Sequence, residues 1–150
     1  MDIVFFVIRY TPFWSIPIIF IAGGTGFGPI KAIIEHLILI QSSRPIHLYW
    51  GVRTEQDIYL NLPSDWSKNH SNINFIPVLS EPDSSWSGES GYVHETVVKD
   101  FENLTDYEVY ACGPPVMVKA AAKSCLENNL MKENIFSDSF EYATVSTADE

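Results

Sequence analysis

Short apolar runs alternate with helical patterns along most of this chain. Residues 18–22 form an unbroken apolar run with no polar face, which predicts a strand buried on both sides. Residues 29–41 carry Ile and Leu side chains at helical spacing and predict a helix. The other predicted strands cover residues 46–52, 72–79, 107–112 and 135–142. The other predicted helices cover residues 54–60, 92–101 and 114–129, and the Ser-, Pro- and Gly-rich residues 80–91 predict a loop.

This alternation predicts an α/β fold, a doubly wound parallel sheet with helices on both faces. Right-handed crossovers between five strands favour the strand order 3-2-1-4-5. In such a sheet a ligand binds where the strand order reverses, at the carboxyl ends of strands one and four. Two unusual segments follow those two strands, and both are candidates for a ligand site.

The first segment has the sequence GGTGFGP at residues 23–29, directly after the first strand. Its glycines let a ligand approach bare backbone, and Pro29 suits the first turn of the following helix. The amino end of that helix offers N–H groups and a positive dipole end to a pyrophosphate. The spacing differs from the standard G-x-G-x-x-G fingerprint, so a tight turn without a ligand is an equal alternative.

The second segment has the sequence CGPPVM at residues 112–117, after the fourth strand. A glycine at the strand end and prolines that open a helix repeat the design of the first segment. The thiol of Cys112 is expected to project into the crevice, although a small buried side chain is the usual state of a cysteine. Because both segments end adjacent strands of the predicted sheet, we expect them to share one ligand.

Composition narrows the class of ligand. A net charge of −10 argues against a nucleic-acid partner, which needs clustered Lys and Arg, whereas backbone donors can still hold a dinucleotide. Two cysteines, Cys112 and Cys125, are too few for a disulfide scaffold or an iron–sulfur cluster, so a cytoplasmic setting is expected. No apolar run reaches the ~20 residues of a membrane span. The histidines lack metal-ligand spacing, and no G-x-S-x-G motif is present.

The sequence resembles the ferredoxin–NADP reductase superfamily, and more narrowly its bacterial flavin-reductase and CDP-6-deoxy-glucoseen-reductase-like branch. The resemblance covers residues 17–143 and implies a domain that binds NAD(P)H and positions nicotinamide for hydride transfer to FAD or FMN. The matching pieces are IAGGTGFGP at residues 21–29, YWGVR at residues 49–53, GYVHE at residues 91–95 and YACGP at residues 110–114.

The resemblance also implies roles for individual positions. Cys112 matches a cysteine beside the nicotinamide C4 atom, from which the hydride leaves. Glu141 loosely matches an acidic residue near the flavin, and both are candidate catalytic residues. The turn that cradles pyrophosphate and nicotinamide ribose is matched by Gly23, Gly24, Thr25, Gly26 and Pro29. The nucleotide-facing start of the last helix is matched by Gly113, Pro114 and Met117.

Charge at the end of the third predicted strand favours NADH over NADPH. NADPH-using relatives carry Ser-Arg there to hold the 2′-phosphate, and the matching residues here are Ser80 and Glu81. A glutamate repels a phosphate but accepts a hydrogen bond from a ribose 2′-hydroxyl. Tyr92 matches a position that stacks on adenine. Arg53 has two alternative roles, a contact to phosphate or an ion pair with Asp57.

The resemblance ends near both termini. The family places a flavin-binding β-barrel before this domain, and residues 1–16 are too few to form one, so we interpret them as the remnant of an interdomain connection. Residues 144–150 are small, polar and acidic and predict a disordered tail. Without the barrel, the chain is expected to expose an apolar docking face and to have little activity alone.

Three functional hypotheses follow. The first is an oxidoreductase domain that passes electrons from NADH through a flavin, held by a partner domain in cis or in trans, to an unidentified acceptor. The second is a catalytically silent nucleotide-binding or protein-interaction module. The third is a flavodoxin-like or other doubly wound domain that shares only the architecture and binds no nicotinamide.

Overall fold

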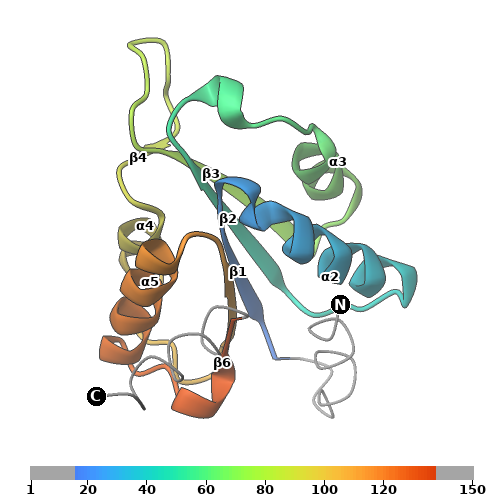
Figure 1. Cartoon of the computed structure of the whole chain (residues 1–150). Helices are drawn as coiled ribbons and strands as arrows, with labels where there is room; N and C mark the ends of the chain where they lie inside the picture. Colours follow the sequence, from blue (N-terminus) through green and yellow to red (C-terminus); the bar gives the residue numbers. More distant parts are fainter. Residues whose placement is uncertain (1–15, 138–150) are drawn as a thin grey trace.

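The computed structural model describes residues 16–137, in which a six-stranded parallel sheet is covered by helices on both faces (Figure 1). The strands are β1 (Ile18–Gly23), β2 (Ile46–Val52), β3 (Ile73–Leu79), β4 (Glu89–Ser90), β5 (Glu108–Cys112) and β6 (Ile135–Phe136). The helices are α2 (Phe27–Leu39), α3 (Leu62–Asn69), α4 (Val93–Asp100) and α5 (Pro115–Glu127), and the 3₁₀ turns are η1 (Gly24–Gly26), η2 (Glu55–Asp57) and η3 (Lys132–Asn134). Residues 1–15 and 138–150 lie outside this description, and with them nearly all of the predicted connection, the end of the predicted last strand and the predicted tail.

The strand order is β4-β3-β2-β1-β5-β6. The prediction of five strands is wrong, because a sixth strand, β4, lies at the edge of the sheet next to β3. The additional strand β4 lies inside the segment that was expected to be a loop and pairs with the end of β3, Leu79 opposite Ser90. Two residues are too few to show an alternating pattern in sequence. The α/β architecture itself is confirmed, and the order reverses at β1, between β2 and β5.

Two further differences concern the segment between β2 and β3. The helix expected over residues 54–60 is only the 3₁₀ turn η2, capped through Thr54 and Asp57. The helix α3, which the sequence analysis did not predict, follows it and buries Pro63 and Trp66. An eight-residue helix with two buried side chains offers no recognisable helical period, which explains why it was missed.

Strand β1 is the centre of the core. Its side chains alternate between two apolar clusters, one beneath α2 and α3 and the other beneath α4 and α5. Residues 18–22 have no exposed surface, as the unbroken apolar run predicted. Burial on both faces fixes the strand and therefore fixes the turn at its carboxyl end.

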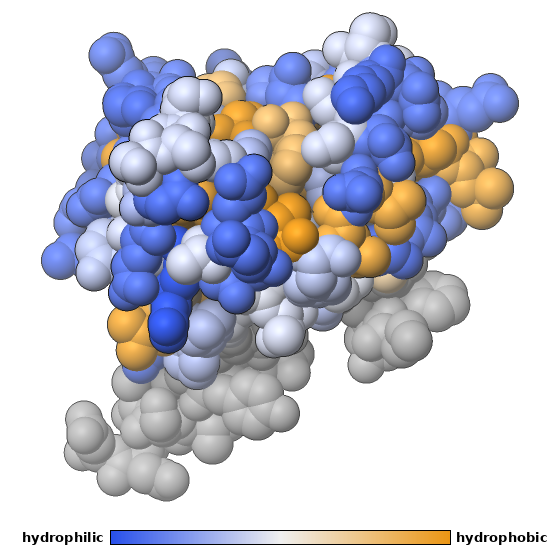
Figure 2. Space-filling view, turned by 90° about the horizontal axis from the view of Figure 1, so that it is seen from above, coloured by the Kyte–Doolittle hydropathy of each residue, from blue (hydrophilic) through white to orange (hydrophobic). Residues whose placement is uncertain are grey.

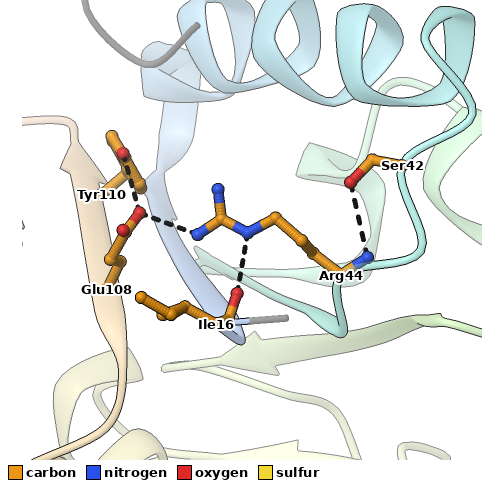
Figure 3. A network of polar contacts seen from close by, with 5 residues as sticks. All are labelled: Ile16, Ser42, Arg44, Glu108 and Tyr110. Atoms are coloured by element: carbon orange, nitrogen blue, oxygen red, sulfur yellow. Dashed lines mark hydrogen bonds and ion pairs between the residues drawn. The ribbon is translucent and has the colours of Figure 1, made fainter. Parts of the chain in front are cut away.

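A buried ion pair stabilises the end of the sheet at which β1, β2 and β5 begin. Arg44 Nη2 lies 2.8 Å from Glu108 Oε2, and Arg44 Nε donates to the Ile16 carbonyl at 2.7 Å (Figure 3). The Tyr110 hydroxyl donates to the same carboxylate at 3.2 Å. Burial, and then the Glu108 carboxylate, raise the pKa of Tyr110, so the hydroxyl keeps its proton. This network joins the beginnings of β2 and β5 to the chain that enters β1.

Candidate functional site

The two glycine-containing turns predicted from the sequence are in direct contact. They follow β1 and β5, which pair in parallel with Ala22 opposite Cys112. A Cβ atom placed on Gly26 would lie 2.2 Å from the Cys112 carbonyl oxygen. A Cβ atom on Gly113 would lie 3.1 Å from Gly23 Cα. The two segments therefore lie against each other at the position where the strand order reverses, as expected from the sequence.

The turn η1 is exposed and leads directly into α2. Gly24 has a φ of +53° and open space beside it, with nothing within 4 Å of a Cβ placed there. Thr25 and Pro29 are exposed as well. The helix begins at Phe27, two residues earlier than expected, and its first N–H groups have no intrahelical acceptor. Bare backbone, open space and a helix amino end together fit the binding of an anionic group such as pyrophosphate.

Cys112 lies at the expected strand end, but its side chain does not project into a crevice. The residue is 3% exposed and belongs to the apolar cluster that contains Phe27 and Trp50. Its carbonyl oxygen, rather than its thiol, faces the turn at Gly26. The expectation of an exposed thiol is therefore wrong for this structure, which matches the alternative of a small buried side chain.

The start of α5 forms the rim of the site next to β5. Pro114 is exposed and Val116 is 82% exposed. Met117 is half-buried and packs on the end of β1, since a Cβ atom on Gly23 would lie 2.3 Å from its sulfur. Figure 2, which views this carboxyl edge of the sheet from above, shows hydrophobic side chains exposed among hydrophilic ones. The rim can therefore contact an apolar surface.

Arg53, Ser80 and Glu81 lie together at the ends of β2 and β3. The Glu81 N–H donates to the Arg53 carbonyl at 2.8 Å, and Arg53 Nε lies 3.8 Å from Glu81 Oε2. The alternative pairing of Arg53 with Asp57 is wrong, because Asp57 accepts hydrogen bonds from the Thr54 N–H and hydroxyl at 3.0 Å. The Arg53 and Glu81 side chains are 77% and 67% exposed, so their ion pair is weak and either can turn to a ligand.

Tyr92 lies at the same edge, beyond β4. Leu79 pairs with Ser90 at the ends of β3 and β4, and Glu81 and Tyr92 each follow two residues after those ends. Tyr92 is 65% exposed, and its ring is stacked on that of His94 with centroids 5.9 Å apart. Four predicted residues thus follow the successive strands from β4 to β1, and Cys112 is the last residue of the next strand, β5. We call these five the carboxyl-edge row: Tyr92, Glu81, Arg53, Gly24 and Cys112.

Two features of this edge were missed by the sequence analysis. Trp50 donates its indole N–H to the Gly24 carbonyl at 3.0 Å, and the only signal in sequence was that a buried indole needs an acceptor. A cavity of about 60 Å³ adjoins Glu81 and is also lined by Glu55, Asp83 and Trp86. Hydrogen bonds from the Ser85 hydroxyl and N–H lower the pKa of Asp83, so this side of the site is negatively charged.

Other expectations concern groups away from this edge. Glu141 lies outside the described residues. Within residues 16–137, no group of three or more His, Cys, Asp or Glu side chains is arranged to hold a metal ion. None of the helices in that part of the chain has the length and apolar character needed to cross a bilayer.

Comparison with known proteins gives consistent matches. The family model for the oxidoreductase NAD-binding domain matches residues 20–123. The CDP-6-deoxy-L-threo-D-glycero-4-hexulose-3-dehydrase reductase of Yersinia pestis is 40% identical over 126 residues, which are 84% of this chain and 38% of that protein. The NAD(P)H-flavin reductase of Vibrio harveyi is 34% identical over 128 residues, covering 84% of this chain and 54% of that protein. The crystal structure of the Amycolatopsis cytochrome P450 reductase GcoB superposes with a TM-score of 0.76 at 29% identity, over 83% of this chain and 37% of that one.

The chain thus spans only 38% and 54% of the lengths of the two curated relatives. The part matched by the family model contains both turns and each of the residues in the carboxyl-edge row. The resemblance inferred from the sequence motifs is confirmed. The chain belongs to the oxidoreductase NAD-binding domain family, the nucleotide-binding domain of ferredoxin–NADP reductase-like proteins.

Proposed function

We propose that this domain binds NADH along the carboxyl edge of its sheet and presents the nicotinamide to a flavin held by a partner domain, in cis or in trans. The observation that carries the proposal is the carboxyl-edge row. Its members follow one another from β4 to β5 in the order in which adenine, ribose, pyrophosphate and nicotinamide follow one another in NADH. The row spans about 19 Å, four interstrand spacings of about 4.8 Å, so the dinucleotide lies extended across the strand ends.

Pyrophosphate binding is assigned to η1 and the first turn of α2. The open space beside Gly24 and the exposure of Thr25 and Pro29 support this assignment. The N–H groups of the turn and the helix dipole both favour an anion there. A dinucleotide can therefore bind even though the chain carries a net charge of −10.

Preference for NADH over NADPH is assigned to the acidic end of the edge. Glu81 is exposed, and Glu55 and Asp83 line the same small cavity. A 2′-phosphate placed beside Glu81 would be repelled by these three carboxylates and attracted by Arg53, whose Nε lies 3.8 Å from Glu81 Oε2. The Glu81 carboxylate can instead accept a hydrogen bond from a ribose 2′-hydroxyl, while Ser80 offers a further hydroxyl and Tyr92 a face for adenine.

The reactive end is assigned to the turn after β5. NADH supplies a hydride and FAD or FMN accepts it, and the protein contributes by orienting the ring rather than by acid–base chemistry. The Cys112 backbone and Gly113 form the wall against which the ring would lie, and Pro114 and Met117 support it. Cys112 as the residue beside C4, and Glu141 near the flavin, remain predictions. A cytoplasmic location, expected from the low cysteine count, is also part of this proposal.

Isothermal titration of the chain with NADH and NADPH tests the binding part of the proposal. We expect Glu81→Arg to shift the ratio of the two dissociation constants toward NADPH roughly tenfold, since it replaces a repelling carboxylate by a charged donor. Glu133→Arg makes the same charge change at an exposed residue before β6 and should leave the ratio unaltered. If Glu81→Arg binds both coenzymes as the parent does, the placement of the ribose is wrong.

Electron transfer is tested separately with NADH, added FAD or FMN, and ferricyanide as acceptor. Reduction of ferricyanide that depends on both the flavin and the chain supports a reductase domain. Tight NADH binding without any such reduction, with the chain alone and with its flavin domain supplied in trans, would favour the silent nucleotide-binding module. Absence of NADH and NADPH binding would reject both.

A further inference from the structure

Trp50 contacts the turn η1 and the first residue of α2 from the buried side. It lies in β2 and has no exposed surface. Its Nε1 atom donates to the Gly24 carbonyl at 3.0 Å, and its ring stacks on Phe27 with centroids 4.2 Å apart and planes at 14°. Gly24 is the first residue of η1 and Phe27 the first of α2, so one rigid side chain holds the beginning of the turn and the beginning of the helix.

The hydrogen bond determines where the next amide points. A trans peptide is planar, with its C=O and N–H directed to opposite sides. Because the Gly24 carbonyl points toward the buried indole, the N–H of Thr25 in the same peptide points away from the sheet. Thr25 is exposed, so this N–H is directed toward the open side of the turn, where the pyrophosphate is proposed to bind.

The rest of the turn is fixed by other contacts. On the side of β5, the backbone of Gly26 packs against the Cys112 carbonyl, with no room for a Cβ atom. Gly24 itself has a positive φ, which glycine adopts freely and other residues adopt only with strain. Nothing lies within 4 Å of a Cβ atom placed on Gly24, so the hydrogen bond from Trp50 is the side-chain contact available to orient the peptide between Gly24 and Thr25.

We propose that Trp50 is a positioning residue for dinucleotide binding, which aims the Thr25 N–H at the pyrophosphate. This inference rests on the proposed function. Without the indole donor the Gly24 peptide can rotate, and binding must then include the cost of ordering it. The side chain acts through the backbone of the turn and does not itself touch the ligand.

The test compares Trp50→Phe with Trp66→Phe in the full chain by titration with NADH. Trp66 is 7% exposed and packs against the same Phe27 ring, with centroids 6.1 Å apart, but among the described residues its indole makes no hydrogen bond to the turn. Both substitutions shrink the same aromatic cluster. We expect Trp50→Phe to raise the dissociation constant for NADH about three- to tenfold more than Trp66→Phe, the effect of one lost hydrogen bond.

A second variant separates the hydrogen bond from packing. Replacing Trp50 by β-(3-benzothienyl)alanine puts sulfur in place of the indole N–H and retains ring shape and stacking. This variant should match the parent in melting temperature to within a few degrees and still bind NADH about threefold or more weakly. Equal affinity of the sulfur variant and the parent would overturn the inference. Failure of the parent itself to bind NADH would instead reject the proposed function, so the two failures are distinguishable.

Discussion

A methyl group at Gly26 tests the contact on which the site depends. The added Cβ would lie 2.2 Å from the Cys112 carbonyl oxygen, 2.5 Å from the Cys112 carbonyl carbon and 2.7 Å from Gly113 Cα. All three atoms are backbone, so no flexible side chain can move away. Gly28 provides a matched control two residues later, because a Cβ placed there has no neighbour within 4 Å.

The size of the effect follows from these distances. Relieving the contact from 2.2 Å to the 3.0 Å that real Cβ atoms respect requires the turn and β5 to separate by about 0.8 Å. Overpacking of this kind typically costs about 1–3 kcal/mol. Gly28→Ala carries no such cost and replaces a helical glycine, so it should stabilise the chain by up to about 1 kcal/mol. The two substitutions should therefore change the free energy of unfolding in opposite directions.

Urea unfolding, monitored by tryptophan fluorescence at equal m values, measures the free energy of unfolding of both variants. Titration with NADH measures the functional consequence for Gly26→Ala, which we expect to bind at least about tenfold more weakly than the parent, since its pyrophosphate turn is displaced. If Gly26→Ala is as stable as Gly28→Ala, the turns after β1 and β5 do not pack as described. The single ligand site at their junction would then be wrong as well.

Two further predictions concern the framework rather than the edge. Arg44→Met should lower the free energy of unfolding by about 3–5 kcal/mol, because it leaves the Glu108 carboxylate buried without its cation; adding Glu108→Gln should restore part of the loss in urea titrations. Burial lowers the pKa of His47 more than nearby Asp100 raises it. Stability should therefore be complete above the unfolded pKa of about 6.5 and fall as the pH decreases toward the lower folded pKa. His47→Gln should remove the part of the decline that begins below about pH 6.5, and an unchanged decline would refute the assignment.

The parts of the fold that the sequence predicts correctly are those determined by local pattern. The apolar run at residues 18–22 requires burial on both faces wherever it lies, and the structure buries all of it. The glycines of η1 and the two prolines at the start of α5, Pro114 and Pro115, mark strand ends by chain geometry alone. Right-handed crossovers then bring those ends together, which is why the contact between the two turns could be inferred from the sequence alone.

The errors concern features that only tertiary contacts decide. Strand β4 is formed by pairing with the end of β3, Val78 opposite Glu89, and the Glu89 side chain also meets Lys99, with Nζ 2.7 Å from its Oε2. The partner of Arg53 is Glu81 on the neighbouring strand rather than Asp57 four residues along the chain. The burial of Cys112 depends on helix α2 covering it, which no local pattern records. Each of these depends on residues that are distant in the sequence.

The topology of the sheet separates coenzyme choice from flavin docking in the proposed arrangement. The nicotinamide lies at β5, and hydride transfer requires the flavin within about 3–3.5 Å of it. The partner domain must therefore approach over the start of α5, where Val116 is 82% exposed. The ribose end at Glu81 lies three strands away, about 14 Å at the spacing of neighbouring strands. A substitution there can change the preference between NADH and NADPH without altering the surface that meets the flavin domain, so the two properties can vary independently on this one sheet.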